Sequence, residues 1–167
     1  LIRLCNSSKS PEVILAAASA IAELSVDGRS RRKVLALGGI KPLCSLLNDA
    51  CEAEGRGTAT LAEQQMISLV AFAVSRLAID PLIRAELARV GAISPLAELC
   101  RHSKNKITLH ACCMALSNMS FENAANKARI VGGGAVQAIV RILAEETESA
   151  VVFEAAKCLS NITCDCI

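Results

Sequence analysis

The sequence contains no tryptophan, no tyrosine and only three phenylalanines among its 167 residues. Even so, 53% of the residues are hydrophobic, which is enough to bury a sizeable core and excludes a disordered chain. A core so poor in aromatics must be built from Ala, Leu, Ile, Val and Cys. Such a core suits close-packed helices better than a β-sandwich, whose strands favour aromatic residues. The composition therefore predicts an all-α protein.

An excess of charge of one sign is also missing. Eighteen Lys and Arg face 16 Asp and Glu, and this balance lacks the electrostatic footprint of a nucleic-acid-binding protein. No uncharged run has the length needed to span a bilayer, and the N-terminus shows no signal-peptide pattern. From the cysteines, interpreted below as reduced thiols, we expect an intracellular protein, in the cytoplasm or alternatively in the nucleus or on the cytoskeleton. Because the chain opens on Leu1 and stops in an apolar run at Ile167, we expect a fragment of a longer protein.

Nine cysteines are present, and most of them lie in apolar helical patterns. We expect reduced thiols that act as small buried hydrophobes. The residues concerned are Cys5, Cys44, Cys100, Cys112, Cys113 and Cys158. Cys164 and Cys166 form a C-x-C pair, but a metal site there would need two more ligands, and both histidines are far away in the sequence. We expect no metal and no cofactor.

Internal repeats organise the chain. A turn recurs as GGIKPL at 38–43, GAISPL at 91–96 and GAVQAI at 134–139, and an apolar helical stretch follows each turn. A longer apolar helix then closes at 22–25, 75–78, 117–120 and 160–163. The distance from Leu99 to Met119 is 20 residues, but from Leu46 to Leu77 it is 31. One repeat thus carries an 11-residue insertion, which the polar, Gly-containing stretch 48–60 places in a loop.

Each repeat also contains a shorter amphipathic segment, at 31–37, 81–90 and 126–131. Asp80 before Pro81 predicts a helix start. We take Glu23, Arg76, Asn118 and Asn161 as the reference residues of the four long helices. Three positions before each of them stands a small residue, which permits close helix packing: Ala20, Ala73, Ala115 and Cys158. A short helix, a middle helix and a long helix cannot bury their apolar faces alone, so the copies must stack. We place the end of one repeat at 1–25 and full repeats at 26–78, 79–120 and 121–167.

The chain resembles the armadillo-repeat family, the three-helix repeats of β-catenin and importin-α, over all 167 residues. The residues that carry the resemblance are the G-G/A-I/V-x-P-L turns and the A-L-S-N at 115–118, echoed at 158–161. HEAT repeats are the nearest alternative, and the Gly turn after a short helix argues against them. The resemblance implies a right-handed α-solenoid whose long helices line a concave groove that binds extended segments of partner proteins.

Residues four and eight positions before each reference residue share its helix face. The resulting stripe is Leu15, Ser19 and Glu23; Ser68, Phe72 and Arg76; His110, Met114 and Asn118; and Phe153, Lys157 and Asn161. A carboxamide can both donate to and accept from a peptide group, so Asn118 and Asn161, which match the family's groove asparagines, are candidate backbone ligands. The alternative is a polar residue near a helix end for the two asparagines, and core packing for Phe72 and Phe153.

The groove tryptophans of importin-α, four residues before the asparagine, are replaced by Ser19, Phe72, Met114 and Lys157. Because paired tryptophans form slots for Lys and Arg stems, their absence argues against nuclear-import cargo. Four residues after each reference position stands an acid: Asp27, Asp80, Glu122 and Asp165. These carboxylates either attract a basic ligand or serve as turn and N-cap residues. The cluster Arg29, Arg31, Arg32 and Lys33 either meets an acidic partner or phosphate, or forms a solvated face.

Catalytic motifs are missing. The triple glycine at 132–134 lacks the G-K-[ST] of a phosphate loop, no G-x-S-x-G is present, and His102 and His110 have no metal-ligand spacing with a carboxylate. We therefore predict a non-enzymatic scaffold or adaptor that binds a protein segment, extended or helical, without a small-molecule substrate. The alternatives are a structural subunit packed permanently in a cytoskeletal, ciliary or trafficking assembly and, third, a nuclear-import adaptor. The residues predicted to contact the partner are Glu23, Phe72, Arg76, His110, Met114, Asn118, Glu122, Lys157, Asn161 and Asp165.

Overall fold

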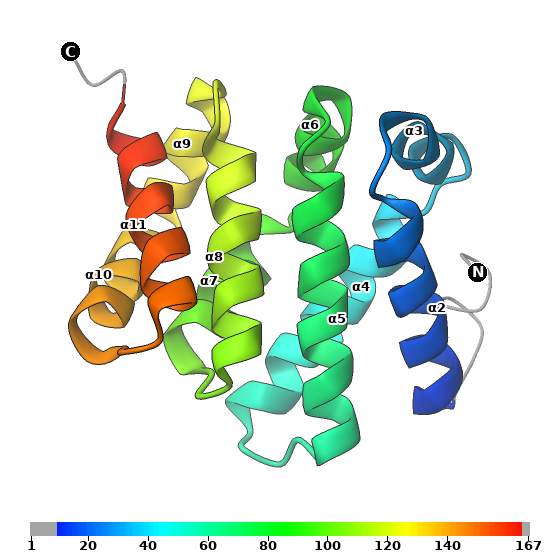
Figure 1. Cartoon of the computed structure of the whole chain (residues 1–167), viewed down its shortest axis with the longest axis horizontal. Helices are drawn as coiled ribbons and strands as arrows, with labels where there is room; N and C mark the ends of the chain where they lie inside the picture. Colours follow the sequence, from blue (N-terminus) through cyan, green and yellow to red (C-terminus); the bar gives the residue numbers. More distant parts are fainter. Residues whose placement is uncertain (1–9, 165–167) are drawn as a thin grey trace.

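The computed structural model describes residues 10–164, and within them the chain forms ten helices and no strand (Figure 1). In order along the chain the helices are α2 (Pro11–Leu24), α3 (Gly28–Ala36), α4 (Ile40–Gly55), α5 (Leu61–Leu77), α6 (Pro81–Arg89), α7 (Ile93–His102), α8 (Lys106–Ser120), α9 (Ala124–Gly132), α10 (Ala135–Glu145) and α11 (Ser149–Thr163). The all-α class expected from the composition is confirmed.

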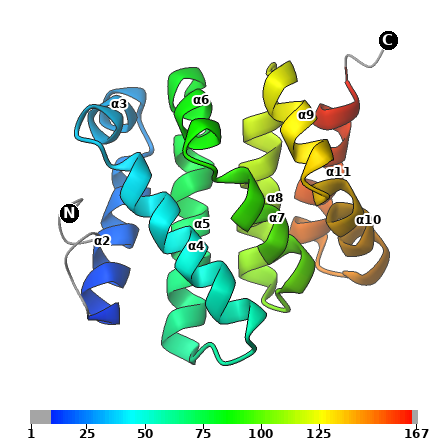
Figure 2. The ribbon, with the colours of Figure 1, turned by 180° about the vertical axis from the view of Figure 1, so that it is seen from behind.

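The helices after α2 repeat a pattern of short, middle and long helix three times. The long helices α2, α5, α8 and α11 stand side by side as one layer, and each contacts the next (Figure 1). The middle helices α4, α7 and α10 form the layer behind them (Figure 2), and the short helices α3, α6 and α9 lie along one edge. All four long helices therefore present one face on the same side of the molecule.

Turn chemistry explains why each short helix ends where it does. Gly38, Gly91 and Gly134 have φ angles of 73°, 89° and 74°, a left-handed backbone that favours glycine, and a middle helix follows each of them within a few residues. Each short helix begins at a side-chain N-cap: Asp27 for α3, Asp80 for α6 and Asn123 for α9. The recurring glycine turns and the N-cap role of Asp80 agree with the sequence-based expectation.

The core consists of small and aliphatic side chains. Ala73, Ala115 and Cys158, at the position expected to hold a small residue, are fully buried, and Ala20 at the same position of α2 is half-buried. Five of the cysteines expected in the core are buried free thiols: Cys44, Cys100, Cys112, Cys113 and Cys158. The sixth, Cys5, lies outside the described residues, as does Cys166. Burial raises the pKa of the Cys44 thiol to about 12, as expected for a thiol that acts as a small hydrophobe.

The expected loop over 48–60 is wrong for most of its length. α4 continues to Gly55 and has 16 residues, whereas α7 and α10 have 10 and 11. The segment 48–55 is rich in Ala and Glu, which favour helix, and Ala50 is buried. The chain leaves the helix only at 56–60, where Gly57 has a positive φ and Thr60 starts α5 with a capping box. The insertion therefore lengthens a helix more than a loop.

No single helix among residues 10–164 has the length and apolarity to cross a membrane; by length and composition alone, α3 and α4 meet that threshold together as a pair bent by 86°. In the same part of the chain, no group of three or more His, Cys, Asp or Glu side chains is arranged to hold a metal ion.

Candidate partner-binding face

The exposed face of the long-helix layer carries most of the stripe predicted from the sequence. We define the long-helix face as Glu23 of α2; Phe72 and Arg76 of α5; Ile107, His110, Met114 and Asn118 of α8; and Phe153, Lys157 and Asn161 of α11. Every one of these side chains is half-buried or exposed. Ser68 of the predicted stripe is instead buried, and its Oγ lies 2.8 Å from the Oγ1 of Thr108 on the next long helix.

Asn118 joins α8 to the end of α5. Its Nδ2 donates to the carbonyl oxygen of Ser75 at 2.9 Å. Ser75 lies among the last four residues of α5, whose carbonyls have no intrahelical partner, and the N–H of Ile79 bonds to Arg76 instead. Asn118 therefore satisfies an orphan carbonyl one repeat earlier. The sequence had marked this position but not its partner.

Asn161 repeats this arrangement on α11. Its Nδ2 lies 3.1 Å from the carbonyl oxygen of Ser117 and 3.1 Å from the Oγ of the same residue. Within the described residues, neither Asn161 nor Asn118 has a hydrogen bond at Oδ1. Asn118 keeps a second N–H, whereas the Nδ2 of Asn161 has two acceptors on Ser117. Both side chains are half-buried on the long-helix face. Each carboxamide is thus held by the preceding helix while its acceptor oxygen stays available, and Asn118 also keeps a donor.

Aromatic and cationic side chains surround these amides. The guanidinium of Arg76 lies over the ring of Phe72, 4.8 Å from its centroid, which holds the cation against α5. Phe72 also packs against the core, whereas Phe153 is 65% exposed. Core packing therefore explains the partial burial of Phe72, but it does not explain the exposed position of Phe153. The Nζ of Lys157 lies 3.4 Å from Oε2 of Glu154, which is buried beneath it.

Two of the recurring acids have structural roles at the starts of short helices. Asp27 accepts from the N–H of Ser30 at 2.9 Å. The side chain of Ser30, and then its backbone N–H, lower the pKa of the Asp27 carboxyl by hydrogen bonding. Asp80 accepts from the N–H of Leu82 and pairs with Arg32 at 3.2 Å. Burial alone would raise the pKa of Asp80, but the hydrogen bonds outweigh it, and the pKa is lowered.

Glu122 and Asp165 do not extend this row of N-caps. Asn123, not Glu122, starts α9 and accepts from the N–H of Asn126 at 2.9 Å. Glu122 precedes it with a φ of 47°, in the left-handed region that non-glycine residues seldom adopt. Asp165 lies outside the described residues. The two described acids at helix starts therefore follow the structural alternative, an N-cap role.

Cations on the short helices bind the carbonyl ends of the long helices, a role that the sequence reading missed. Arg31 donates to the carbonyls of Ser25 and Val26 after α2. Arg84, only 7% exposed, donates to the carbonyls of Ala78 and Ile79 after α5 and of Phe121 after α8. The available signal was spacing, because both arginines stand four residues after the N-cap acid.

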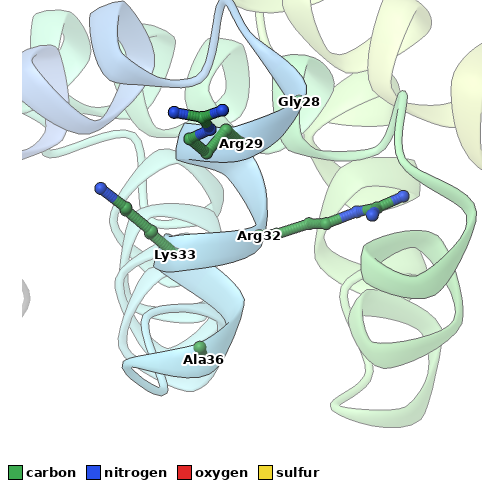
Figure 3. Close-up of a pocket in the computed structure, with 5 residues that line it drawn as sticks. All are labelled: Gly28, Arg29, Arg32, Lys33 and Ala36. Atoms are coloured by element: carbon green, nitrogen blue, oxygen red, sulfur yellow. The ribbon is translucent and has the colours of Figure 1, made fainter.

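The basic cluster on α3 does not converge on a single point. A hollow of about 630 Å³ runs along this helix, lined by Gly28, Arg29, Arg32, Lys33 and Ala36. Figure 3 shows the side chains of Arg29 and Lys33 pointing away from Arg32, which turns to the opposite side of the helix. Arg32 is paired with Asp80 of α6. This divergence favours a solvated helix face over an anion site.

Comparison with solved structures identifies the fold. An engineered protein superposes with a TM-score of 0.81 at 26% identity, over 97% of this chain and 60% of its own. A designed armadillo repeat protein gives a TM-score of 0.81 at 20% identity, over 96% of this chain and 63% of its own. Another designed armadillo repeat protein, in complex with the peptide (KR)4, gives a TM-score of 0.81 at 24% identity, over 96% of this chain and 62% of its own. The chain spans about three fifths of each.

By sequence, neither a protein-family profile nor a curated protein matches the chain. The fold itself is shown by the structural comparisons: the described helices form an armadillo-repeat solenoid, as the sequence resemblance implied.

Proposed function

We propose that this armadillo-type solenoid is a binding module that holds an extended segment of a partner protein against its long-helix face. The observation that carries the proposal is the arrangement of Asn118 and Asn161. Each is fixed to the preceding long helix through its Nδ2 while its Oδ1 stays available on an accessible surface, and Asn118 also keeps one N–H. A peptide group offers the complementary donor and acceptor, so the two amides can hold a backbone without selecting its side chains.

Helix spacing supports an extended ligand. Neighbouring packed helices lie roughly 10 Å apart, and an extended chain advances about 3.3 Å per residue, so Asn118 and Asn161 would contact peptide groups about three residues apart. The fold is shared with a designed armadillo repeat protein that was solved in complex with a peptide. In this proposal the module binds and positions its partner and performs no chemistry.

Selection of peptides from a random library displayed on phage tests the proposal. Peptides that bind the wild-type chain should lose at least tenfold in affinity for the N118A/N161A double variant, measured by fluorescence polarisation. N126A is a matched control because Asn126 also donates to a long-helix carbonyl, that of Met119 at 2.9 Å, but is buried away from the face. Circular dichroism verifies that all variants are folded. Equal affinities for wild type and N118A/N161A would contradict the proposal.

A permanent structural subunit of a larger assembly is the second candidate. The observation that favours it is the extension of α4 and α5 around the connection 56–60, at whose end Leu61 is 72% exposed. An apolar residue at the tip of an elongated helix pair is suited to packing against another subunit. In that case shortening the connection and substituting Leu61→Ser would disrupt assembly, whereas N118A/N161A would not.

A further inference from the structure

We infer that the partner segment carries carboxylates alternating with apolar residues where it crosses α5, α8 and α11. The inference rests on the proposed function and specifies the chemistry of the ligand at the same face.

The charges on this part of the face are of one sign. Arg76 and Lys157 are cationic, and from α5 to α11 the long-helix face as defined contains no carboxylate. Arg76 stacks on Phe72 and has no ion pair with a carboxylate among the described residues. Lys157 has a single described partner, Glu154, and an ammonium group has three N–H donors. Both cations can therefore accept a further carboxylate.

Two of the acids predicted to attract a basic ligand, and one acid beside Lys157, are engaged in other contacts. Asp27 and Asp80 cap short helices, and Asp80 is paired with Arg32. Glu154 is only 8% exposed and lies beneath Lys157. Glu23 is the one carboxylate of the long-helix face, and it stands on α2, beyond Arg76. The charge on the face thus changes sign between α2 and α5, which confines the acid-binding stretch to the last three long helices.

Apolar side chains lie on the same face as the two cations. Phe153 is largely exposed one helical turn before Lys157, Ile107 is exposed at the start of α8, and Met114 of α8 is half-buried. Burial of apolar surface on Phe153 and Ile107 would contribute affinity, while the cations would select the sign of the partner's charge. A uniformly acidic segment would leave this apolar surface uncovered, so the complementary ligand is mixed.

Two synthetic peptides of equal length test the inference, one alternating Glu with Leu and Phe, the other with Lys in place of Glu. Fluorescence polarisation gives their Kd at low and moderate salt. We expect the Glu peptide to bind at least tenfold tighter than the Lys peptide, and to weaken as salt rises. The R76E/K157E variant should reverse this preference. The control K33E/K104E has the same change in net charge, and both its sites are exposed residues outside the long-helix face.

Equal or tighter binding of the Lys peptide would overturn the inference, as would an unchanged preference in R76E/K157E or binding of neither peptide. The proposed function has a separate readout. If the Lys peptide binds and N118A/N161A still weakens it, the face binds peptides and only the assigned charge is wrong. If N118A/N161A has no effect on either peptide, the proposed function itself fails.

Discussion

The carboxamide of Asn161 donates to the carbonyl oxygen of Ser117 at 3.1 Å and so joins the last long helix to the end of the one before it. Asn118 makes the corresponding bond to Ser75. In both pairs a side chain on the accessible face completes the backbone hydrogen bonding of its neighbour. These asparagines therefore contribute to stability as well as to the proposed binding. For each substitution, both the free energy of unfolding and the affinity for the peptide have to be measured.

Substitution of Asn118 by Ala should lower the free energy of unfolding by about 1 kcal/mol, the typical net contribution of one hydrogen bond, because the Ser75 carbonyl loses its partner. Urea unfolding followed by circular dichroism measures this loss. Glu23→Ala is the matched control, because Glu23 occupies the same stripe position but is exposed. An equal effect of both substitutions would show that the Asn118–Ser75 bond is not formed in solution.

Substitution of Arg84 by Met should have a larger effect, about 2–3 kcal/mol, because three backbone carbonyls at the ends of α5 and α8 lose a charged donor. The guanidinium also lies 5.7 Å from the centroid of the Phe121 ring. Arg29→Met, on the exposed side of α3, should change the free energy by less than about 0.5 kcal/mol. Urea midpoints that coincide for the two variants would contradict the assigned role of Arg84.

Asp80 should make stability depend on pH in the acidic range. Its pKa in the folded chain lies below the ordinary value of 3.8, so its ionised form contributes stability above that value. This contribution is lost as the pH falls through the lowered pKa. Asp80→Asn keeps an N-cap oxygen but removes the charge. The difference in unfolding free energy between wild type and D80N should be constant from pH 7 to about pH 5 and shrink below about pH 4. A constant difference down to pH 2 would contradict the lowered pKa.

Thiol labelling should separate the exposed cysteine from the buried ones. In a C5S/C51S/C166S background, the folded chain should react with a disulfide reagent rapidly at one site, the exposed Cys164. The five buried thiols should react only in denaturant, because burial excludes the reagent and raises the pKa of Cys44 and Cys158. Mass spectrometry identifies the labelled residues. Fast labelling of Cys112 or Cys113 in the folded chain would contradict the buried arrangement.

The repeat could be predicted from the sequence because glycine turns and small residues recur at fixed intervals, and a left-handed turn or a close helix contact tolerates few other residues. The segment 48–55 could not, because its glycine and polar residues resemble a loop while its helix formation depends on burial of Ala50 against the rest of the fold. Counting four residues from Asn118 places Glu122 at the position that corresponds to Asp80. In the structure the N-cap of α9 is one residue later, at Asn123.

The contacts of the site that could not be predicted from the sequence have one cause in common. Arg84 and the asparagines act on carbonyls some 40 residues away or at the ends of other helices, and a backbone carbonyl carries no residue-specific signal in a sequence. The periodic positions of Asn118 and Asn161 were visible, but which of their amide groups would be engaged depended on the helix packed beside them.

The asparagine bonds between repeats all run in one direction. Asn118, Asn126 and Asn161 donate from a later repeat to a carbonyl in an earlier one. A long helix emerging from the ribosome therefore presents carbonyls whose partners have not yet been synthesised. Removal of the last three helices would leave the end of α8 without the bonds from Asn126 and Asn161, whereas removal of α2 would break none of the three. The array thus has an intrinsic polarity, and unfolding by fraying should be easier from a truncated C-terminal end than from a truncated N-terminal one.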